Sequence, residues 1–259
     1  MAGNMTKLIL ILALACGSAM AVEIVAHRGA NKIAPENTQA AVQKCIDLGV
    51  EWVEIDVRQS RDGVFYDLHD KNVERMTTGK GLLASLSSDE IDKLDAGTKF
   101  SAAFAGEHIP RVRDLLLLMK GTKSKPYFDF KNGNVAQFTA LVRELCMTKD
   151  CFFYFGDDPV LQEFRKVAPD MPFKVNAATV QAVEDAVKQG KPDIVECPLS
   201  SLTPEYMAAC RKHNIKVMVW ESQADAAMLP GLMTSPADMI NTDHADTLVR
   251  MRAESAGKK

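Results

Sequence analysis

The sequence of 259 residues has little net charge, and this scarcity excludes one class of partner. Its 31 Lys and Arg residues are nearly balanced by 34 Asp and Glu residues, which gives a formal net charge of −3. A protein that binds the phosphate backbone of a nucleic acid usually presents a basic face. The two lysines at the C-terminus are too few to form one, so we expect no nucleic-acid partner.

Motifs with a short diagnostic spacing are also missing. The cysteines form neither a CxxC pair nor the spacing of a zinc site. The stretch "TTGKG" at 77–81 lacks the spacing of a Walker loop and its strand-to-helix context. No internal repeat, low-complexity tract or interdomain linker is present. With 47% hydrophobic residues, the chain has the size and composition of one catalytic domain, such as a single α/β barrel.

The N-terminal apolar run, from Leu8 to Ala15, is too short to span a bilayer. It precedes Ala19-Met20-Ala21, a small-x-small pattern typical of a signal-peptide cleavage site. We predict that residues 1–21 are a signal peptide, that residues 22–259 form the mature domain, and that the protein is exported to the periplasm or secreted. A lipoprotein anchored through Cys16 is the weaker alternative, because Ala13 stands where a leucine is usual.

Removal of the signal peptide would leave an odd number of cysteines, so at least one thiol would be unpaired within the chain. The five cysteines that remain are Cys45, Cys146, Cys151, Cys197 and Cys210. Cys146 and Cys151, joined by a short polar link, are the pair best placed for a disulfide. Alternatively, all five are small core residues, since free cysteine is often buried. The sequence leaves both interpretations open.

Short apolar or β-rich runs alternate with amphipathic segments of helical length along the chain. The expected strands are Glu23–Ala26, Trp52–Val57, Tyr127–Phe130, Phe152–Phe155, Phe173–Val175, Ile194–Glu196, Lys216–Val219 and Met239–Asn241. The expected helices are Thr38–Leu48, Arg111–Met119, Val135–Leu145, Val160–Val167, Val180–Gln189, Pro204–His213, Ala224–Leu229 and a C-terminal helix from Asp246. Eight repeats of this alternation predict a (β/α)8 TIM barrel.

One segment interrupts the alternation. Asp62-Gly63 is a hairpin signal, and the short strand Val64–Leu68 after it should fold back against the second strand. Residues from about 70 to 125 then form an insertion, in which Ser87 to Glu90 carries the pattern of a helix capping box.

Polar and charged residues collect at the C-terminal ends of the expected strands. They are Glu54 and Asp56, Asp129 and Lys131, His27 and Arg28, and, near the last three strands, Glu196, Trp220 and Asp243. A period of two places both charged residues of the second strand, and both of the third, on one face. Barrel enzymes carry their active sites at this end, so we expect one here. Glu196 and Asp243 are explained at least as well as helix-cap or rim residues.

Glu54, Asp56 and Asp129 form a set of oxygen ligands suited to one divalent cation, Ca²⁺ or Mg²⁺. Arg28 and Lys131 beside them would favour an anion bound to that cation. His27 and His69 can transfer protons near neutral pH. A phosphate ester fits this combination, because the cation and the basic side chains would offset its charge.

These residues belong to a pattern that resembles the glycerophosphodiester phosphodiesterase family, whose members are TIM barrels. The pattern comprises "HRG" and "APENT", then "EIDV" with a downstream "DG" and "HD", an acidic-x-Lys strand, a late "VW" and a closing "NTD". The motifs stand in the family's order and span nearly all of the mature chain. Their combined spacing is specific, although each pair alone is weak.

The resemblance implies metal-dependent hydrolysis of small-molecule glycerophosphodiesters to glycerol 3-phosphate and an alcohol. By position, His27 and His69 correspond to the acid/base pair, the three carboxylates to metal ligands, and Arg28 and Lys131 to phosphate contacts. Glu36 corresponds to a carboxylate near the ligand, or it caps the following helix. Trp220 corresponds to an apolar wall for the substrate, or it packs in the core. The resemblance implies no oligomeric state.

Departures from the family pattern bear on substrate choice more than on reaction class. Asp129 stands where the family usually has a glutamate, one methylene longer. This aspartate is shared with phospholipase D-like relatives of the sphingomyelinase D type, which act on lysophospholipids and are the alternative enzyme class. A secreted binding protein on a catalytically dead barrel is the third hypothesis, against which the intact His27 and His69 argue.

Overall fold

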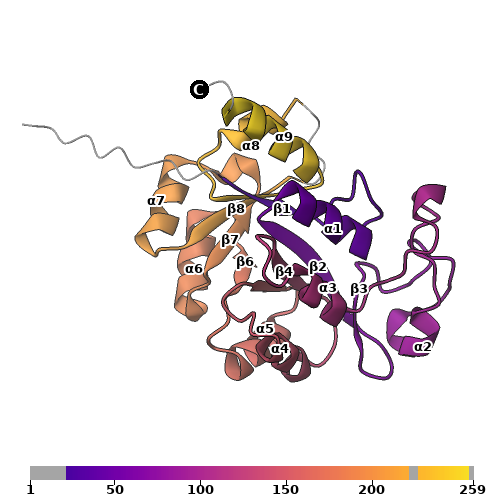
Figure 1. Cartoon of the computed structure of the whole chain (residues 1–259). Helices are drawn as coiled ribbons and strands as arrows, with labels where there is room; N and C mark the ends of the chain where they lie inside the picture. Colours follow the sequence, from indigo (N-terminus) through magenta and orange to yellow (C-terminus); the bar gives the residue numbers. More distant parts are fainter. Residues whose placement is uncertain (1–21, 222–226, 257–259) are drawn as a thin grey trace, which may run out of the picture.

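The computed structural model describes residues 22–221 and 227–256, which form a nearly closed barrel of eight parallel strands (Figure 1). The strands follow the order β5-β4-β2-β1-β9-β8-β7-β6. A parallel bridge between Phe153 and Phe173 joins the two edges. The bounds are β1 (Glu23–Ala26), β2 (Trp52–Gln59), β4 (Lys125–Phe130), β5 (Phe152–Phe155), β6 (Lys174–Asn176), β7 (Ile194–Cys197), β8 (Lys216–Trp220) and β9 (Met239–Thr242).

Helices cover the outside of the barrel (Figure 1). They are α1 (Gln39–Leu48), α3 (Val112–Met119), α4 (Val135–Glu144), α5 (Asp158–Val167), α6 (Val180–Gly190), α7 (Pro204–Lys212), α8 (Leu229–Met233) and α9 (Ala245–Ala256). The side chain of Thr38 caps the N-terminus of α1, and Gly49, with φ of 69°, ends that helix in the left-handed conformation. No helix in the described ranges is long and apolar enough to cross a membrane.

The predicted barrel is confirmed, and all eight expected strands are present within two residues of their expected ends. Of the helix expected at Ala224–Leu229, residues 224–226 lie outside the described residues. Residues 227–228 form a turn, so the expectation is wrong there, and the helix α8 begins only at Leu229. The predicted signal peptide (residues 1–21) and Cys16 also lie outside the described residues. The five described cysteines are free thiols, four of them buried and Cys146 exposed. The structure therefore contains no disulfide between Cys146 and Cys151, and four of the five cysteines are core residues.

The expected hairpin is also present. The short strand β3 (Phe65–Asp67) pairs antiparallel with the end of β2. The chain then makes an excursion before α3, drawn at the right of Figure 1. It contains the short helix α2 (Ser88–Ile91), which begins with the predicted capping box of Ser87 and Glu90. A small core of its own, centred on Tyr66, Leu83 and Ile91, holds the excursion together.

The barrel interior is layered, and this layering positions the polar residues. The lower layer is apolar and contains Val25, Tyr127, Phe152, Ile194, Met218 and Met239. Two positions further along the same strands, and therefore on the same face, stand His27, Asp129, Tyr154, Glu196, Trp220 and Asn241, which line one cavity. The barrel is thus closed below by apolar packing, and its functional groups gather above, at the C-terminal ends of the strands.

Candidate active site

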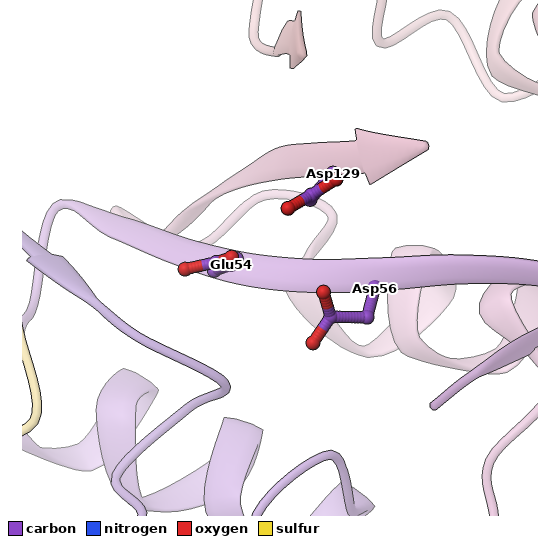
Figure 2. A group of neighbouring side chains, drawn as sticks. All are labelled: Glu54, Asp56 and Asp129. Atoms are coloured by element: carbon purple, nitrogen blue, oxygen red, sulfur yellow. The ribbon is translucent and has the colours of Figure 1, made fainter. Parts of the chain in front are cut away.

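Three carboxylates lie together at the C-terminal end of the barrel. Glu54 and Asp56 stand on β2 and Asp129 stands on the neighbouring β4, directly opposite Asp56 in register (Figure 2). One oxygen of each carboxylate lies within 4.8 Å of the other two. The residues are 4%, 0% and 8% exposed, respectively. Buried carboxylates so close together repel one another unless a cation compensates their charge.

This donor set fits a hard divalent cation, because its members are all carboxylate oxygens. Oδ1 of Asp56 is buried and faces Nζ of Lys131 at 3.1 Å, and a carboxylate oxygen with one such neighbour keeps a lone pair for coordination. Burial, followed by the charge of Asp56, raises the pKa of Glu54 well above its usual value and also raises the pKa of Asp129. A bound cation would favour the ionised form of both. The shorter side chain of Asp129 still reaches the cluster.

Two basic residues border the carboxylates. Nζ of Lys131 lies 2.6 Å from Oδ2 of Asp129 and 3.1 Å from Oδ1 of Asp56. Burial alone would lower the pKa of Lys131, but the two carboxylates raise it, so this side chain stays charged. Nε of Arg28 is 3.9 Å from Asp56 and donates no hydrogen bond to any described residue. The charged side chains of Lys131 and Arg28 therefore both lie where they can contact an anion beside the carboxylates.

The loop that carries Arg28 has an unusual backbone. Arg28 itself has φ of 56°, and Gly29, with φ of 79°, follows it. A Cβ at Gly29 would lie 2.8 Å from the Cβ of Ala41 on α1. The glycine of the "HRG" motif is therefore required both by the left-handed turn and by the close approach of α1.

His27 is held by a carboxylate from the other end of the chain. Its Nδ1 lies 2.6 Å from Oδ1 of Asp243, which also accepts a bond of 2.5 Å from the side-chain amide of Asn31. Burial alone would raise the pKa of Asp243, but the hydrogen bonds from His27 and Asn31 outweigh burial and lower the pKa to about 2. An ionised carboxylate only accepts hydrogen bonds, so Nδ1 of His27 carries the proton and Nε2 remains for substrate. The ring of Trp220 packs against His27 at a centroid distance of 4.5 Å.

His69 has a similar carboxylate partner in a longer network. Its Nδ1 lies 2.9 Å from Asp70, whose other oxygen accepts a bond of 2.5 Å from Arg75. The bond from Arg75, together with that from His69, lowers the pKa of Asp70 to about 2. Arg75 also donates to Glu36 at 2.7 Å, and Glu36 accepts from Arg28 at 3.1 Å. An unbroken chain of hydrogen bonds thus connects His69 to Arg28.

Two positioning residues were not anticipated from the sequence. Arg58 donates to the carbonyl oxygen of His69 from Nε at 3.1 Å and from Nη2 at 2.6 Å, which fixes the backbone at this histidine. Asn37 donates to Asp56 at 3.0 Å and to the buried Asp67 at 2.6 Å, which orients the Asp56 carboxylate. Arg58 stands two residues after Asp56, so the period of two already placed it on the same face of β2.

The structure brings the nine predicted site residues to one region. Seven of them line a single cavity of about 210 Å³: His27, Arg28, Glu54, His69, Asp129, Lys131 and Trp220. Asp56 lies directly behind them, against Lys131. Glu36 bonds to Arg28, and it is Thr38 that caps α1, so the ligand-proximal alternative for Glu36 agrees with the structure and the capping alternative does not.

Comparison with known proteins matches this arrangement to one family. The model of the glycerophosphoryl diester phosphodiesterase family matches residues 27–147. The curated glycerophosphodiester phosphodiesterase of Caldanaerobacter subterraneus subsp. tengcongensis is 27% identical over 236 residues, which cover 88% of this chain and 96% of that protein. A phosphodiesterase from Oleispira antarctica, solved in complex with the product sn-glycerol-3-phosphate, has a TM-score of 0.77 at 21% identity, with 92% of this chain and 98% of that chain covered. At that identity the likeness shows the fold alone.

A crystal structure of a glycerophosphodiester phosphodiesterase from Agrobacterium tumefaciens is a stronger match. It is 33% identical, covers 88% of this chain and 99% of its own, and gives a TM-score of 0.82. The matched family region, residues 27–147, contains both histidines and all three carboxylates of the cluster. The resemblance seen in the sequence is therefore confirmed, and the chain belongs to the glycerophosphoryl diester phosphodiesterase family.

Proposed function

We propose that this protein hydrolyses glycerophosphodiesters to glycerol 3-phosphate and an alcohol, with one divalent cation and with His27 and His69 as the acid/base pair. The observation that carries the proposal is the meeting of both histidines with Glu54 and Asp129 of the acidic cluster in one cavity at the C-terminal end of a barrel. The names of the family and of the Agrobacterium and Caldanaerobacter relatives support the same reaction.

Glu54, Asp56 and Asp129 would hold the cation, either Ca²⁺ or Mg²⁺. When bound, it would supply positive charge that stabilises the negative charge of the phosphoryl oxygens in the transition state. Lys131 and the unpartnered Nε of Arg28 add further positive charge at the same place. Asn37 holds Asp56 in orientation throughout, because it bonds to the oxygen that does not face Lys131.

The two histidines divide the proton transfers. In each of them Nδ1 is bonded to an ionised carboxylate, so Nε2 is the atom available to the substrate. In the proposed first step the glycerol hydroxyl next to the phosphate loses its proton to one histidine and forms a bond to phosphorus. The bond from phosphorus to the alcohol oxygen breaks, and the other histidine protonates that oxygen. Water then opens the resulting cyclic phosphate by the reverse proton transfers.

The cyclic phosphate can be tested directly by single-turnover hydrolysis followed with ³¹P NMR. A transient cyclic glycerophosphate signal that precedes glycerol 3-phosphate is expected. Direct appearance of glycerol 3-phosphate, with no cyclic species in rapid-quench samples, would contradict attack by the neighbouring hydroxyl.

The reaction itself is tested by release of glycerol 3-phosphate from glycerophosphocholine, with the chain from Val22 in Ca²⁺, Mg²⁺ or EDTA. Metal-dependent release is expected, with a loss of at least about 100-fold in a His27→Ala variant. A matched control is His213→Ala, because His213 bonds to Glu184 on the outer helices, away from the cavity. Turnover of lysophosphatidylcholine alone would favour the sphingomyelinase D-like alternative, and binding without turnover would favour the dead barrel.

Export through a signal peptide at residues 1–21 remains part of the proposal. It is supported by the apolar run and the Ala-Met-Ala pattern of the sequence. Intact mass spectrometry of the protein expressed from its full-length gene should give a chain that begins at Val22. A chain that keeps residues 1–21, or one acylated at Cys16, would contradict it.

A further inference from the structure

The catalytic cavity has a second wall that the proposed chemistry does not use. Around the barrel from the acidic cluster, it is formed by Lys174 and Asn176 of β6, Glu196 of β7 and Asn241 of β9, with Tyr154 of β5 beside them. The register pairs Asn176 with Glu196. Polar groups at this depth are costly unless they are satisfied, so their hydrogen bonds reveal what the wall can bind.

Lys174 is fully engaged by its neighbours. It is 1% exposed, forms an ion pair with Oε2 of Glu196, and donates to Oδ1 of Asn176 at 3.0 Å. Its Nζ also lies 3.8 Å from the centre of the Tyr154 ring. An ammonium group has three donors and no acceptor, so Lys174 serves mainly to hold Glu196 in place and has little left to offer a ligand.

Two acceptor atoms of this wall have no partner in the described part of the chain. They are Oε1 of Glu196 and Oδ1 of Asn241, and both are buried. The amide nitrogen of Asn241 donates to Glu54 at 3.3 Å, which turns its oxygen away from that carboxylate. Because buried acceptors that lack donors are destabilising, these atoms require hydrogen-bond donors from a ligand or from water. A phosphate cannot supply them, whereas an alcohol hydroxyl can.

We propose that Glu196, held by Lys174, binds the terminal hydroxyl of the glycerol unit and thereby selects substrates in which that hydroxyl is free. The inference rests on the proposed function and adds to it the residue that reads the terminal hydroxyl. With the phosphate at the acidic cluster and the neighbouring hydroxyl at the histidines, the terminal hydroxyl is the part of the glycerol unit that extends furthest from phosphorus. β7 is separated from β4 by β5 and β6, and Glu196 lines the same cavity as Glu54 and Asp129, on a different side of it from the acidic cluster.

A substrate acylated or methylated at this hydroxyl has no donor for Glu196 and would leave a buried carboxylate oxygen unpaired. Sites that hydrogen-bond a substrate hydroxyl reject analogues without it far more strongly than apolar pockets distinguish a methylene. The wall therefore acts as a specificity determinant against lysophospholipids, while the acidic cluster and the histidines determine the reaction.

The test compares glycerophosphocholine with its 1-deoxy analogue, which keeps the neighbouring hydroxyl and lacks only the terminal one. The wild-type protein should prefer glycerophosphocholine in kcat/KM by about 10- to 100-fold. In Glu196→Gln the side-chain oxygen can remain on Lys174, and an NH₂ donor then faces the cavity. The preference should fall to within about twofold, mostly through a higher KM for glycerophosphocholine, with little change for the 1-deoxy analogue.

Controls separate this role from a structural one. Glu184→Gln, which removes a carboxylate from an ion pair on the outer helix α6, should leave the preference unchanged. If Glu196→Gln does not fold, Glu196→Asp keeps the charge beside Lys174 but shortens the reach, and should reduce the preference partially. Equal losses for both substrates in either variant would overturn the proposal, because a structural defect acts on both alike.

Failure of the proposed reaction would be distinguishable. A wild-type protein that hydrolyses neither diester would contradict the proposed function, yet calorimetry with Ca²⁺ could still compare sn-glycerol 3-phosphate with propane-1,2-diol 1-phosphate. Tighter binding of the former by the wild-type protein, lost in Glu196→Gln, would support the hydroxyl subsite. Equal affinity of the wild-type protein for both compounds would overturn it.

Discussion

Replacement of Asp243 by asparagine tests how His27 is positioned. The substitution keeps the shape of the side chain but removes its negative charge. The Asp243 carboxylate accepts hydrogen bonds from His27 at 2.6 Å and from Asn31 at 2.5 Å. An asparagine can also turn its NH₂ group toward His27, which favours the tautomer with the proton on Nε2, the wrong atom for a base that faces the substrate.

Two effects of Asp243→Asn are expected, a lower kcat and a lower folding stability, and the structure sets the size of both. A hydrogen bond to a charged group contributes about 1.5–3 kcal/mol, so its loss in the transition state should lower kcat by about 10- to 150-fold. Asp243, whose side chain is 17% exposed, has a pKa lowered from 3.8 to about 2 in the folded protein. That difference corresponds to about 2 kcal/mol of folding stability.

The pH dependence of this stability has a definite sign. Because the pKa is lower in the folded state, the contribution is fully present above the unfolded value of 3.8 and disappears as the pH falls through about 2. Urea unfolding should therefore show Asp243→Asn to be less stable than the wild type by about 2 kcal/mol at pH 7. The difference should shrink progressively below pH 4.

The assay is kcat and KM for glycerophosphocholine with saturating metal, measured beside Asp246→Asn as a matched control. Asp246 pairs with Arg250 on the surface of α9, so its substitution should leave kcat unchanged. A folded Asp243→Asn protein with kcat within twofold of the wild type would refute the argument that this carboxylate positions a catalytic histidine.

Other parts of the site give further expectations. Removal of the cation with EDTA should abolish activity and lower the unfolding temperature, because a ligand present at 100 times its Kd stabilises the folded state by about 2.7 kcal/mol; an unchanged unfolding temperature would contradict the metal site. Lys131→Met should reduce kcat/KM by about 100-fold through the loss of a charge-assisted contact to phosphate, and a change confined to metal affinity would contradict that role. Arg58→Met should lower kcat by about tenfold, since a single guanidinium fixes the backbone of His69. Its metal affinity, measured by calorimetry, should equal that of the wild type, and a parallel loss of both would argue for a general disruption.

Much of the site could be predicted because the barrel converts sequence position into spatial position. Parallel strands end at the same edge, so the predicted site residues of β2, β4 and β8 had to meet once the eightfold alternation was recognised. The two-residue period placed Glu54 with Asp56 and Asp129 with Lys131 on one face. Local signals also sufficed for the capping box at Ser87 and for the hairpin after Asp62-Gly63.

The partners of these residues could not be predicted in the same way. Asp243 was explained equally well as a rim or cap residue, and it is bonded to a histidine 216 positions away. Lys174 stands within an expected strand, and only the packing of β6 against β7 shows that it holds Glu196. Glu36 could have capped α1, but its contacts with Arg28 and Arg75 come from a loop and from the excursion.

The sequence by itself determined the barrel and the set of residues at its C-terminal end, because periodicity, turn residues and motif order are local properties that any folded form of this chain must express. Only the tertiary structure decided which carboxylate orients which histidine, which acceptors remain unpaired, and which wall of the cavity faces the acidic cluster. Those relations depend on the closure of the barrel, which brings β1 beside β9 and sets the strands across from one another at distances that no local pattern encodes.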